Sequence, residues 1–389
     1  GRVMRRTISG WMTVLCALAA MLGPVRSSCA QWDGYEPQFS SAQLEDAIKS
    51  LELDLEQRDI ARSLHEGYMS DHTRAVEQMK AYMEEIQRIA EATQNWEIWQ
   101  ETSEVWVDFQ QYTRKIRDNM TTDLKMVLRE DQMARWDRLE RKFRRDQEIN
   151  QNYYLGFISG AKVDLVSVLA TAEVPQEVLD SIDSEVNTYE IELDRMLVET
   201  REFIDEWEKK ARDGFDFEQN MEEMTKVYGH GMELVGGIRD LNKRHADKIQ
   251  TLLPEDIRGG FRAAFNEQAY PDIYKTNKVS VAIERSLGMA DLRDDQRERL
   301  GIIKEQYERE LAKANERWAE AKVRYESERT ILSWQNGDEE PDWLTAAREL
   351  RERLDERTME KIESVLTGEQ VERLPGRGKQ TVERPVFGS

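Results

Sequence analysis

The stretch "IDSEVNTYEIELDRMLVETREFIDEW" (Ile182–Trp207) decides the fold class. Its mostly apolar stripe recurs at alternating steps of three and four residues: Ile182, Val186, Tyr189, Leu193, Met196, Thr200, Phe203 and Trp207. This spacing keeps the side chains on one narrow face of a long α-helix, as in coiled coils and helical hairpins. The stretch therefore predicts a long amphipathic helix that packs along another helix.

Two other segments carry the same kind of stripe. One contains His65, Met69, His72, Val76, Met79, Met83, Ile86 and Ala90, and the other contains Tyr307, Leu311, Ala314, Trp318, Ala321 and Tyr325. A polar break follows each stripe, at residues 91–95, 212–216 and 335–342, and a second helical run follows each break. Only 8 of 389 residues are proline, which suits helices. We predict an all-α fold of tandem long helical hairpins with short capping helices and coiled-coil-like packing.

The N-terminal residues have the pattern of a secretory signal peptide. Arg5 and Arg6 precede the apolar run "WMTVLCALAAML" (Trp11–Leu22), and small residues before Gln31 mark a cleavage site. We predict a signal peptide at 1–30, a flexible lead-in at 31–44, and a periplasmic or secreted mature protein. Cys16 and Cys29 both lie in the signal, so the mature chain has no disulfide, and lipidation at Cys29 stays open.

The charge of the chain limits its partners. The net charge is −21, and it becomes −25 when the four basic residues of the signal are removed. So acidic a chain repels nucleic acids and anionic membrane surfaces. No later stretch is long and apolar enough to cross a bilayer. We therefore expect neither nucleic acid nor a membrane span.

A short string brackets each hairpin at both ends. The six strings are "LDLEQ" (53–57), "LREDQ" (128–132), "VPQEV" (174–178), "LPEDI" (253–257), "LRDDQ" (292–296) and "LTGEQ" (366–370). The last residues of the paired strings are 75, 79 and 74 positions apart, which indicates three repeats. In "LTGEQ", Thr367 and Gln370 fit the two halves of a capping box, and Leu366 fits a hydrophobic staple. The predicted structural helix-start residues are Leu53, Gln57, Leu128, Gln132, Leu292, Gln296, Leu366, Thr367 and Gln370.

Paired Leu-Thr-x-x-Gln strings about 75 residues apart, in a helical chain with a signal peptide, resemble the LTxxQ-motif family of periplasmic proteins, the Spy- and CpxP-like chaperones, stress adaptors and related metal-resistance sensors. "LTGEQ" matches in full, three strings keep Leu and Gln, and the middle pair keeps neither Thr nor Gln. The resemblance implies bent helical hairpins, dimeric in known members, with an apolar concave surface for unfolded clients. We predict LTxxQ-like units at 45–150, 160–268 and 280–375, the second degenerate, and a disordered tail at 376–389.

The chain contains no motif of an enzyme: no "GxSxG", no "HExxH" and no phosphate-binding glycine loop. We expect no catalysis and no cofactor. A metal site is one alternative, because His65, Met69 and His72 share a helix face, and imidazole and thioether groups suit a soft or borderline transition metal. Two histidines seven positions apart would need a ligand from a second helix.

The stripes also offer a partner-binding surface. Methionine and aromatic side chains adapt to many shapes, and large exposed apolar patches usually mark binding. The candidate residues are Met79, Met83, Trp96, Trp99, Trp106, Met221 and Met224. The favoured function is reversible binding of unfolded or envelope proteins, with acidic rims attracting basic segments. The alternatives are a structural coiled-coil-like envelope protein whose stripes are all buried, and a metal-responsive sensor; a homo-oligomer stays open.

Overall fold

The computed structural model describes residues 35–95, 98, 102–212, 220–330 and 339–376. Throughout these ranges the chain forms α-helices, short 3-10 segments and connecting turns, and no strand. The predicted all-α fold is confirmed. The predicted signal peptide at 1–30 and most of the predicted tail at 376–389 lie outside the described residues.

The chain divides into two compact units. Unit 1 holds residues up to Ile48 together with Leu53–Val127, and unit 2 holds Lys49–Glu52 together with the chain from Leu128 onward. This division differs from the three repeats predicted from the strings, because residues 128–150 of the first repeat pack within unit 2.

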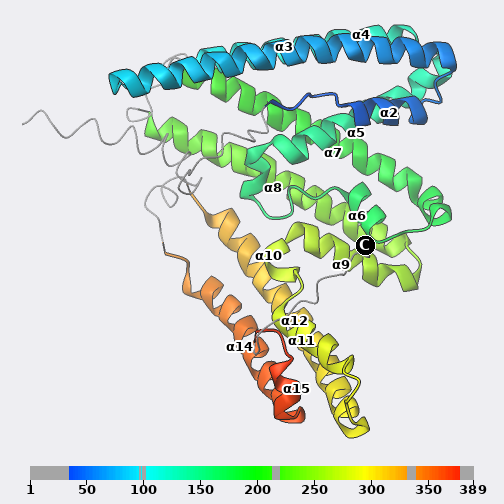
Figure 1. The fold of residues 1–389 in the computed structure, drawn as a ribbon, viewed down its shortest axis with the longest axis vertical. Coiled ribbons are helices and arrows are strands. Elements are labelled where there is room, and N and C mark those ends of the chain that lie inside the picture. Colours follow the sequence, from blue (N-terminus) through cyan, green and yellow to red (C-terminus); the bar gives the residue numbers. More distant parts are fainter. Residues whose placement is uncertain (1–34, 96–97, 99–101, 213–219, 331–338, 377–389) are drawn as a thin grey trace, which may run out of the picture. The chain divides into compact units, whose positions relative to one another are not determined.

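Unit 1 contains α2 (Ser41–Ser50, whose last two residues belong to unit 2), α3 (Leu55–Thr93) and α4 (Thr102–Met126). The helices α3 and α4 lie side by side (Figure 1). The buried stripe of α3 consists of Gln57, Ala61, His65, Tyr68, His72, Ala75, Met79, Ile86 and Ala90. The helix ends inside the predicted polar break, where Gln94 takes a left-handed backbone conformation with φ 54°.

The first half of unit 2 contains α5 (Glu130–Gln151), η3 (Tyr153–Phe157), α6 (Leu165–Thr171), α7 (Gln176–Arg212), α8 (Met221–Leu252) and α9 (Glu255–Ala269). The long helices α7 and α8 pack along each other. At the centre of their core, the fully buried amide of Asn242 donates to the carbonyl oxygens of Gly160 (2.9 Å) and Val163 (3.1 Å). Its own oxygen accepts from the Tyr189 hydroxyl over 3.1 Å, so one side chain fastens the loop before α6 to both long helices.

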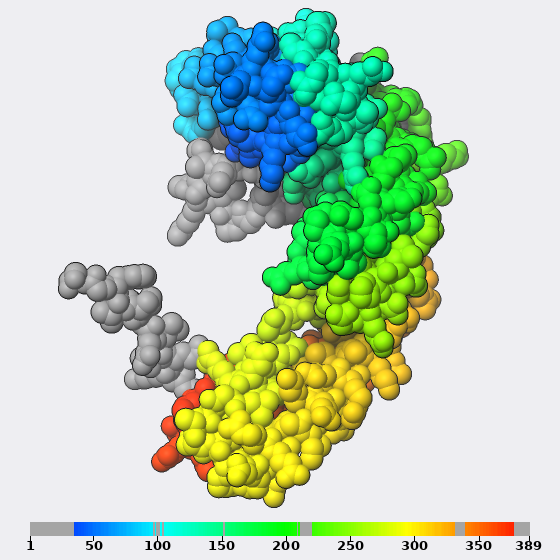
Figure 2. All heavy atoms as spheres, turned by 90° about the vertical axis from the view of Figure 1, so that its right-hand side faces the viewer, coloured from blue at the N-terminus to red at the C-terminus, as the bar shows by residue number. Residues whose placement is uncertain are grey.

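The second half of unit 2 contains α10 (Pro271–Tyr274), α11 (Lys278–Leu287), α12 (Asp294–Glu328), α14 (Asp342–Val365) and α15 (Gly368–Glu372). Helices α11 and α12 pack against each other, in the part of the chain that Figure 2 draws in yellow to orange. Across α12 and α14, Tyr307 donates to Asp355 (2.7 Å) and Arg351 donates to Asn315 (2.9 Å). Burial raises the pKa of Tyr307, and its hydrogen bond to Asp355 adds to that increase.

A charged seam joins α5 to α7. Arg145 is only 3% exposed and donates to Asp164 (3.1 Å) and Glu190 (2.8 Å). Arg138 reaches Glu190 and Asp183, and Arg144 reaches Asp194. Buried charges are tolerated only when they are paired in this way. Part of the acidic excess of the chain is therefore neutralised inside the fold and is not a solvated surface.

Candidate functional site

The residues just before α2 are the most informative part of unit 1. Tyr35–Ser40, which we call the strap, is an irregular, drawn-out segment that runs alongside α3 (Figure 1). Phe39 is 1% exposed, so this part of the chain is packed, in contrast to the flexible lead-in predicted for 31–44. We call the α3 and α4 side chains that meet it the strap surface: His65, Tyr68, His72, Lys80, Trp106 and Phe109.

The C-terminal end of the strap is held through its backbone. The Phe39 N–H donates to the hydroxyl oxygen of Tyr68 over 3.3 Å, and Nε2 of His65 lies 3.1 Å from the Phe39 carbonyl oxygen. Because a carbonyl oxygen only accepts, His65 carries its hydrogen on Nε2. Burial raises the pKa of the Tyr68 phenol, although the backbone hydrogen bonds of Phe39 and Gln38 oppose the increase.

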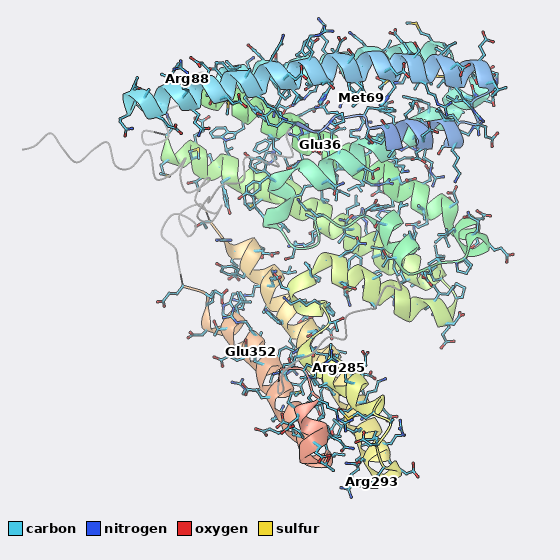
Figure 3. The ribbon with its side chains drawn as sticks, in the orientation of Figure 1. Glu36, Met69, Arg88, Arg285, Arg293 and Glu352 are labelled. Atoms are coloured by element: carbon cyan, nitrogen blue, oxygen red, sulfur yellow. The ribbon has the colours of Figure 1, made fainter. Side chains whose placement is uncertain are left out.

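In the middle of the strap, Glu36 lies near His72. Figure 3 labels Glu36 on the segment that runs alongside α3. Burial lowers the pKa of His72, and it outweighs the negative charge and the backbone hydrogen bond of Glu36, which raise it. Burial therefore favours the neutral imidazole of His72 over the charged form.

The N-terminal end of the strap is held by aromatic contacts. The Tyr35 ring meets Trp106 edge-to-face at a centroid distance of 5.6 Å and Phe109 at 6.0 Å. Nζ of Lys80 lies 5.3 Å from the centre of the same ring, within the range of a cation–π contact. These rings pack on the cluster around Met79.

The structure brings together three of the predicted partner-binding residues. Met79, Met83 and Trp106 belong to the cluster on which Tyr35 packs. Met79 is 3% exposed, so it supports this surface from beneath and offers no open area. Trp96 and Trp99 lie outside the described residues. Met221 and Met224 are partly buried in the first turn of α8, in unit 2, and so do not join the unit 1 cluster.

The predicted metal ligands are only partly aligned. His65 and His72 share the buried face of α3, but the residue between them on that face is Tyr68, whose ring lies 6.0 Å from each imidazole. Met69 is turned away and lines a shallow surface hollow with Glu66, Ser70 and Thr73. Within the described ranges, no group of three or more His, Cys, Asp or Glu side chains is arranged to hold a metal ion.

The motif glutamines begin helices as capping residues. At Asp54 and Thr367 both halves of a capping box are present: the cap oxygen accepts from the glutamine N–H, and the glutamine Oε1 accepts from the cap N–H. At Arg129 and Arg293 only the glutamine half is formed, by Gln132 and Gln296, because a guanidinium has no acceptor.

The same glutamines also fasten the opposite string. The Nε2 group of each donates to a backbone carbonyl one or two residues before the leucine of the paired string: Gln57 to Val127 (2.7 Å), Gln132 to Leu51 (3.1 Å), Gln296 to Val365 (2.8 Å) and Gln370 to Asp291 (3.2 Å). Leu53, Leu292 and Leu366 are buried beside them, and Leu128 is half-buried. Each motif glutamine is thus a cap for its own helix and a clasp to another segment.

The middle pair of strings, 174–178 and 253–257, is held by other contacts than the glutamine hydrogen bonds of the outer pairs. Val178 and Ile257 stand where the other strings have glutamine, and both pack against the first core of unit 2. The Leu253 carbonyl oxygen accepts from Nε of Arg258 over 2.8 Å, as the Leu53 carbonyl oxygen does from Arg58 over 2.7 Å. The degenerate copy therefore keeps part of the backbone capping while it replaces the polar clasp with apolar contact.

One further string escaped the sequence analysis. Ser40 and Gln43 form a reciprocal capping box at the start of α2, with bonds of 2.7 and 3.3 Å, directly after the buried Phe39. An apolar residue followed by Ser-x-x-Gln is a helix-start signal, and it would have placed the end of the strap at Phe39.

None of the helices that the structure describes has the length and apolarity needed to cross a membrane.

Comparisons with protein-family models, with curated proteins and with solved structures find no match for this chain. Functional interpretation therefore depends on the residues themselves and on the LTxxQ resemblance of the strings.

Proposed function

We propose that this protein binds non-native or partner polypeptides reversibly, without catalysis, in the manner of a periplasmic chaperone or envelope-stress adaptor. The observation that carries the proposal is the strap surface. It holds a piece of polypeptide without regular structure by two backbone hydrogen bonds and a set of aromatic contacts. Backbone bonds do not depend on the partner's sequence, and aromatic or methionine side chains adapt to many shapes.

Export is part of the proposal and depends on the signal peptide predicted at 1–30. It places the protein where unfolded envelope proteins occur, and the strings that resemble LTxxQ motifs agree with that location. N-terminal sequencing of the protein recovered from outside the cytoplasm tests this part, with Gln31 expected as the first residue.

An aggregation assay tests binding. The purified protein, added at stoichiometric excess to a chemically unfolded client, is expected to suppress light scattering. Trp106→Ala, which removes a ring from the strap surface, is expected to weaken the suppression. Tyr112→Ala is the matched control, because Tyr112 lies on the same helix and is 43% exposed, and it should behave like the unsubstituted protein. No suppression at any ratio would count against the proposal.

A structural role is the second candidate, and burial of the long stripes favours it. Tyr189 and Leu193 on α7 are at most 1% exposed, and Leu300 on α12 is fully buried. Such stripes hold a hairpin together and leave nothing for a client. An aggregation rate that the protein leaves unchanged, combined with cooperative unfolding of the long helices, would favour this candidate.

A further inference from the structure

The surface that carries the proposed function is occupied by the chain's own strap. We propose that Tyr35–Ser40 is a built-in competitor, and that the strap surface takes a non-helical segment of another polypeptide with two aromatic residues four positions apart. This inference rests on the proposed function and adds to it the chemistry of the partner and a means of regulation.

The order of contacts defines how a partner would lie. Phe39 meets His65 and Tyr68, Glu36 meets His72, and Tyr35 meets the cluster that includes Met79. Positions therefore increase along the strap as they decrease along α3, and the segment runs antiparallel to the helix. An incoming segment in the same direction would place its first aromatic ring by Trp106 and its second by His65.

The contacts of the strap also show which features of a partner the strap surface would recognise. The N–H and carbonyl groups of Phe39 are bound by Tyr68 and His65, and any residue except proline offers both groups. The first ring is selected by Trp106, Phe109 and the cation of Lys80. Sequence preference thus comes from the spacing of two rings, and the backbone bonds add affinity without further selection.

Competition follows from covalent attachment. A segment joined to its binding surface by a short linker acts at an effective concentration on the order of millimolar. The strap leads directly into α2 at Ser41, so it is always close to its surface. A partner in solution at micromolar concentration must therefore outcompete the strap, and a weakened strap gives a more active protein.

The test uses the full chain and a labelled peptide of the strap sequence, "DGYEPQFSSA" (residues 33–42). Fluorescence anisotropy is expected to show at least tenfold tighter binding to Tyr35→Ala/Phe39→Ala than to the unsubstituted protein. Tyr112→Ala is the matched control and should bind as weakly as the unsubstituted protein. A peptide with alanine in place of both aromatic residues should bind none of them.

Two additional measurements keep the test decisive. Because Phe39 is buried, Tyr35→Ala alone serves if the double variant does not fold by circular dichroism, and it should still bind the peptide more tightly than the control. In the unsubstituted protein, excess peptide should accelerate hydrogen exchange at the Phe39 amide, because it displaces the strap.

The outcomes separate the two proposals. A folded variant that binds no peptide, with unchanged exchange at Phe39, overturns the strap inference; if that variant still suppresses aggregation, the proposed function stands. Peptide binding without aggregation suppression in any variant overturns the chaperone-type function and leaves the strap as a self-closing contact.

Discussion

Gln296 donates from Nε2 to Oε1 of Gln370 over 2.9 Å, although 74 positions separate the two residues. Both side chains are buried. The pair joins the first turn of α12 to the first turn of α15, and each glutamine also binds a carbonyl next to the other string. The Gln296 amide therefore links the start of α12 to the end of α14 and to the start of α15, where the hairpin formed by α12 and α14 closes.

Substitution of either glutamine should destabilise this part of unit 2. Gln296→Ala and Gln370→Ala are each expected to lower the free energy of unfolding by about 1–3 kcal/mol, because buried donors and acceptors lose their partners. The double variant should cost less than the two single variants added together, with a coupling of about 0.5–3 kcal/mol. Urea denaturation measures this cycle. Gln306→Ala, which removes only a bond to Glu310 on the same helix, should stay within about 0.5 kcal/mol.

Unit 1 should lose stability in mild acid. Burial lowers the pKa of His72 below its usual value of 6.5, so below that pH the unfolded chain binds a proton that the folded chain does not. Stability is therefore complete above pH 6.5 and falls as the pH decreases toward the folded pKa. Unfolding curves between pH 5 and 8 should show this slope, and His72→Gln should reduce it. His230→Gln is the control because His230 is exposed; an equal reduction there would contradict the assignment.

The polar centre of unit 2 should be sensitive to a single substitution. Asn242→Ala is expected to lower the free energy of unfolding by about 3 kcal/mol, since it leaves two backbone carbonyls and the Tyr189 hydroxyl without their shared partner. Thermal unfolding followed by circular dichroism measures the loss. Asn150→Ala, at an exposed position whose amide binds only Asp146 on its own helix, should change stability little. Similar losses in both variants would contradict the central role of Asn242.

The stability of the charged seam between α5 and α7 should depend on Arg145, its buried arginine. Arg145→Met is expected to cost about 3–5 kcal/mol, because it removes the partner of Asp164 and one partner of Glu190 without removing their charges. Arg135→Met, which breaks partly exposed pairs with Asp131 and Glu52 and an exposed hydrogen bond to the Ser50 carbonyl oxygen, should cost at most about 1 kcal/mol. Guanidinium denaturation distinguishes the two. A loss at Arg145 no larger than that at Arg135 would show that the buried pairs add no stability.

The sequence stripes predicted helices well and side-chain positions less well. The stripe at Ile182–Trp207 lies in α7, and Thr200 is buried as the stripe predicts, but Leu197 and Ile204 are buried where the stripe has Met196 and Phe203. A straight α-helix drifts by about 20° per heptad against a repeat of 3.5 residues, so the buried face moves gradually toward the following positions along a helix of this length. On α3 the buried residue between His65 and His72 is Tyr68, where the stripe has Met69.

Apart from its end at Phe39, which the capping box of Ser40 and Gln43 marks, the strap could not be predicted from local pattern. Tyr35 and Phe39 sit among polar residues with no helical or strand periodicity, and their burial depends on rings and imidazoles 26 to 74 positions away. The glutamine clasps were half predictable. Capping is encoded within five residues, whereas the Nε2 bonds to the opposite string depend on how the hairpin closes.

The apolar closure of the middle strings has a thermal consequence. Hydrophobic contacts weaken on cooling, because the stabilisation gained by burying apolar surface becomes smaller as the temperature decreases. Amide hydrogen bonds do not share this dependence. On chilling, the string ends closed by Val178 and Ile257 should fray before the end closed by Gln296 and Gln370, so that the middle of the chain sets the lower temperature limit of the protein.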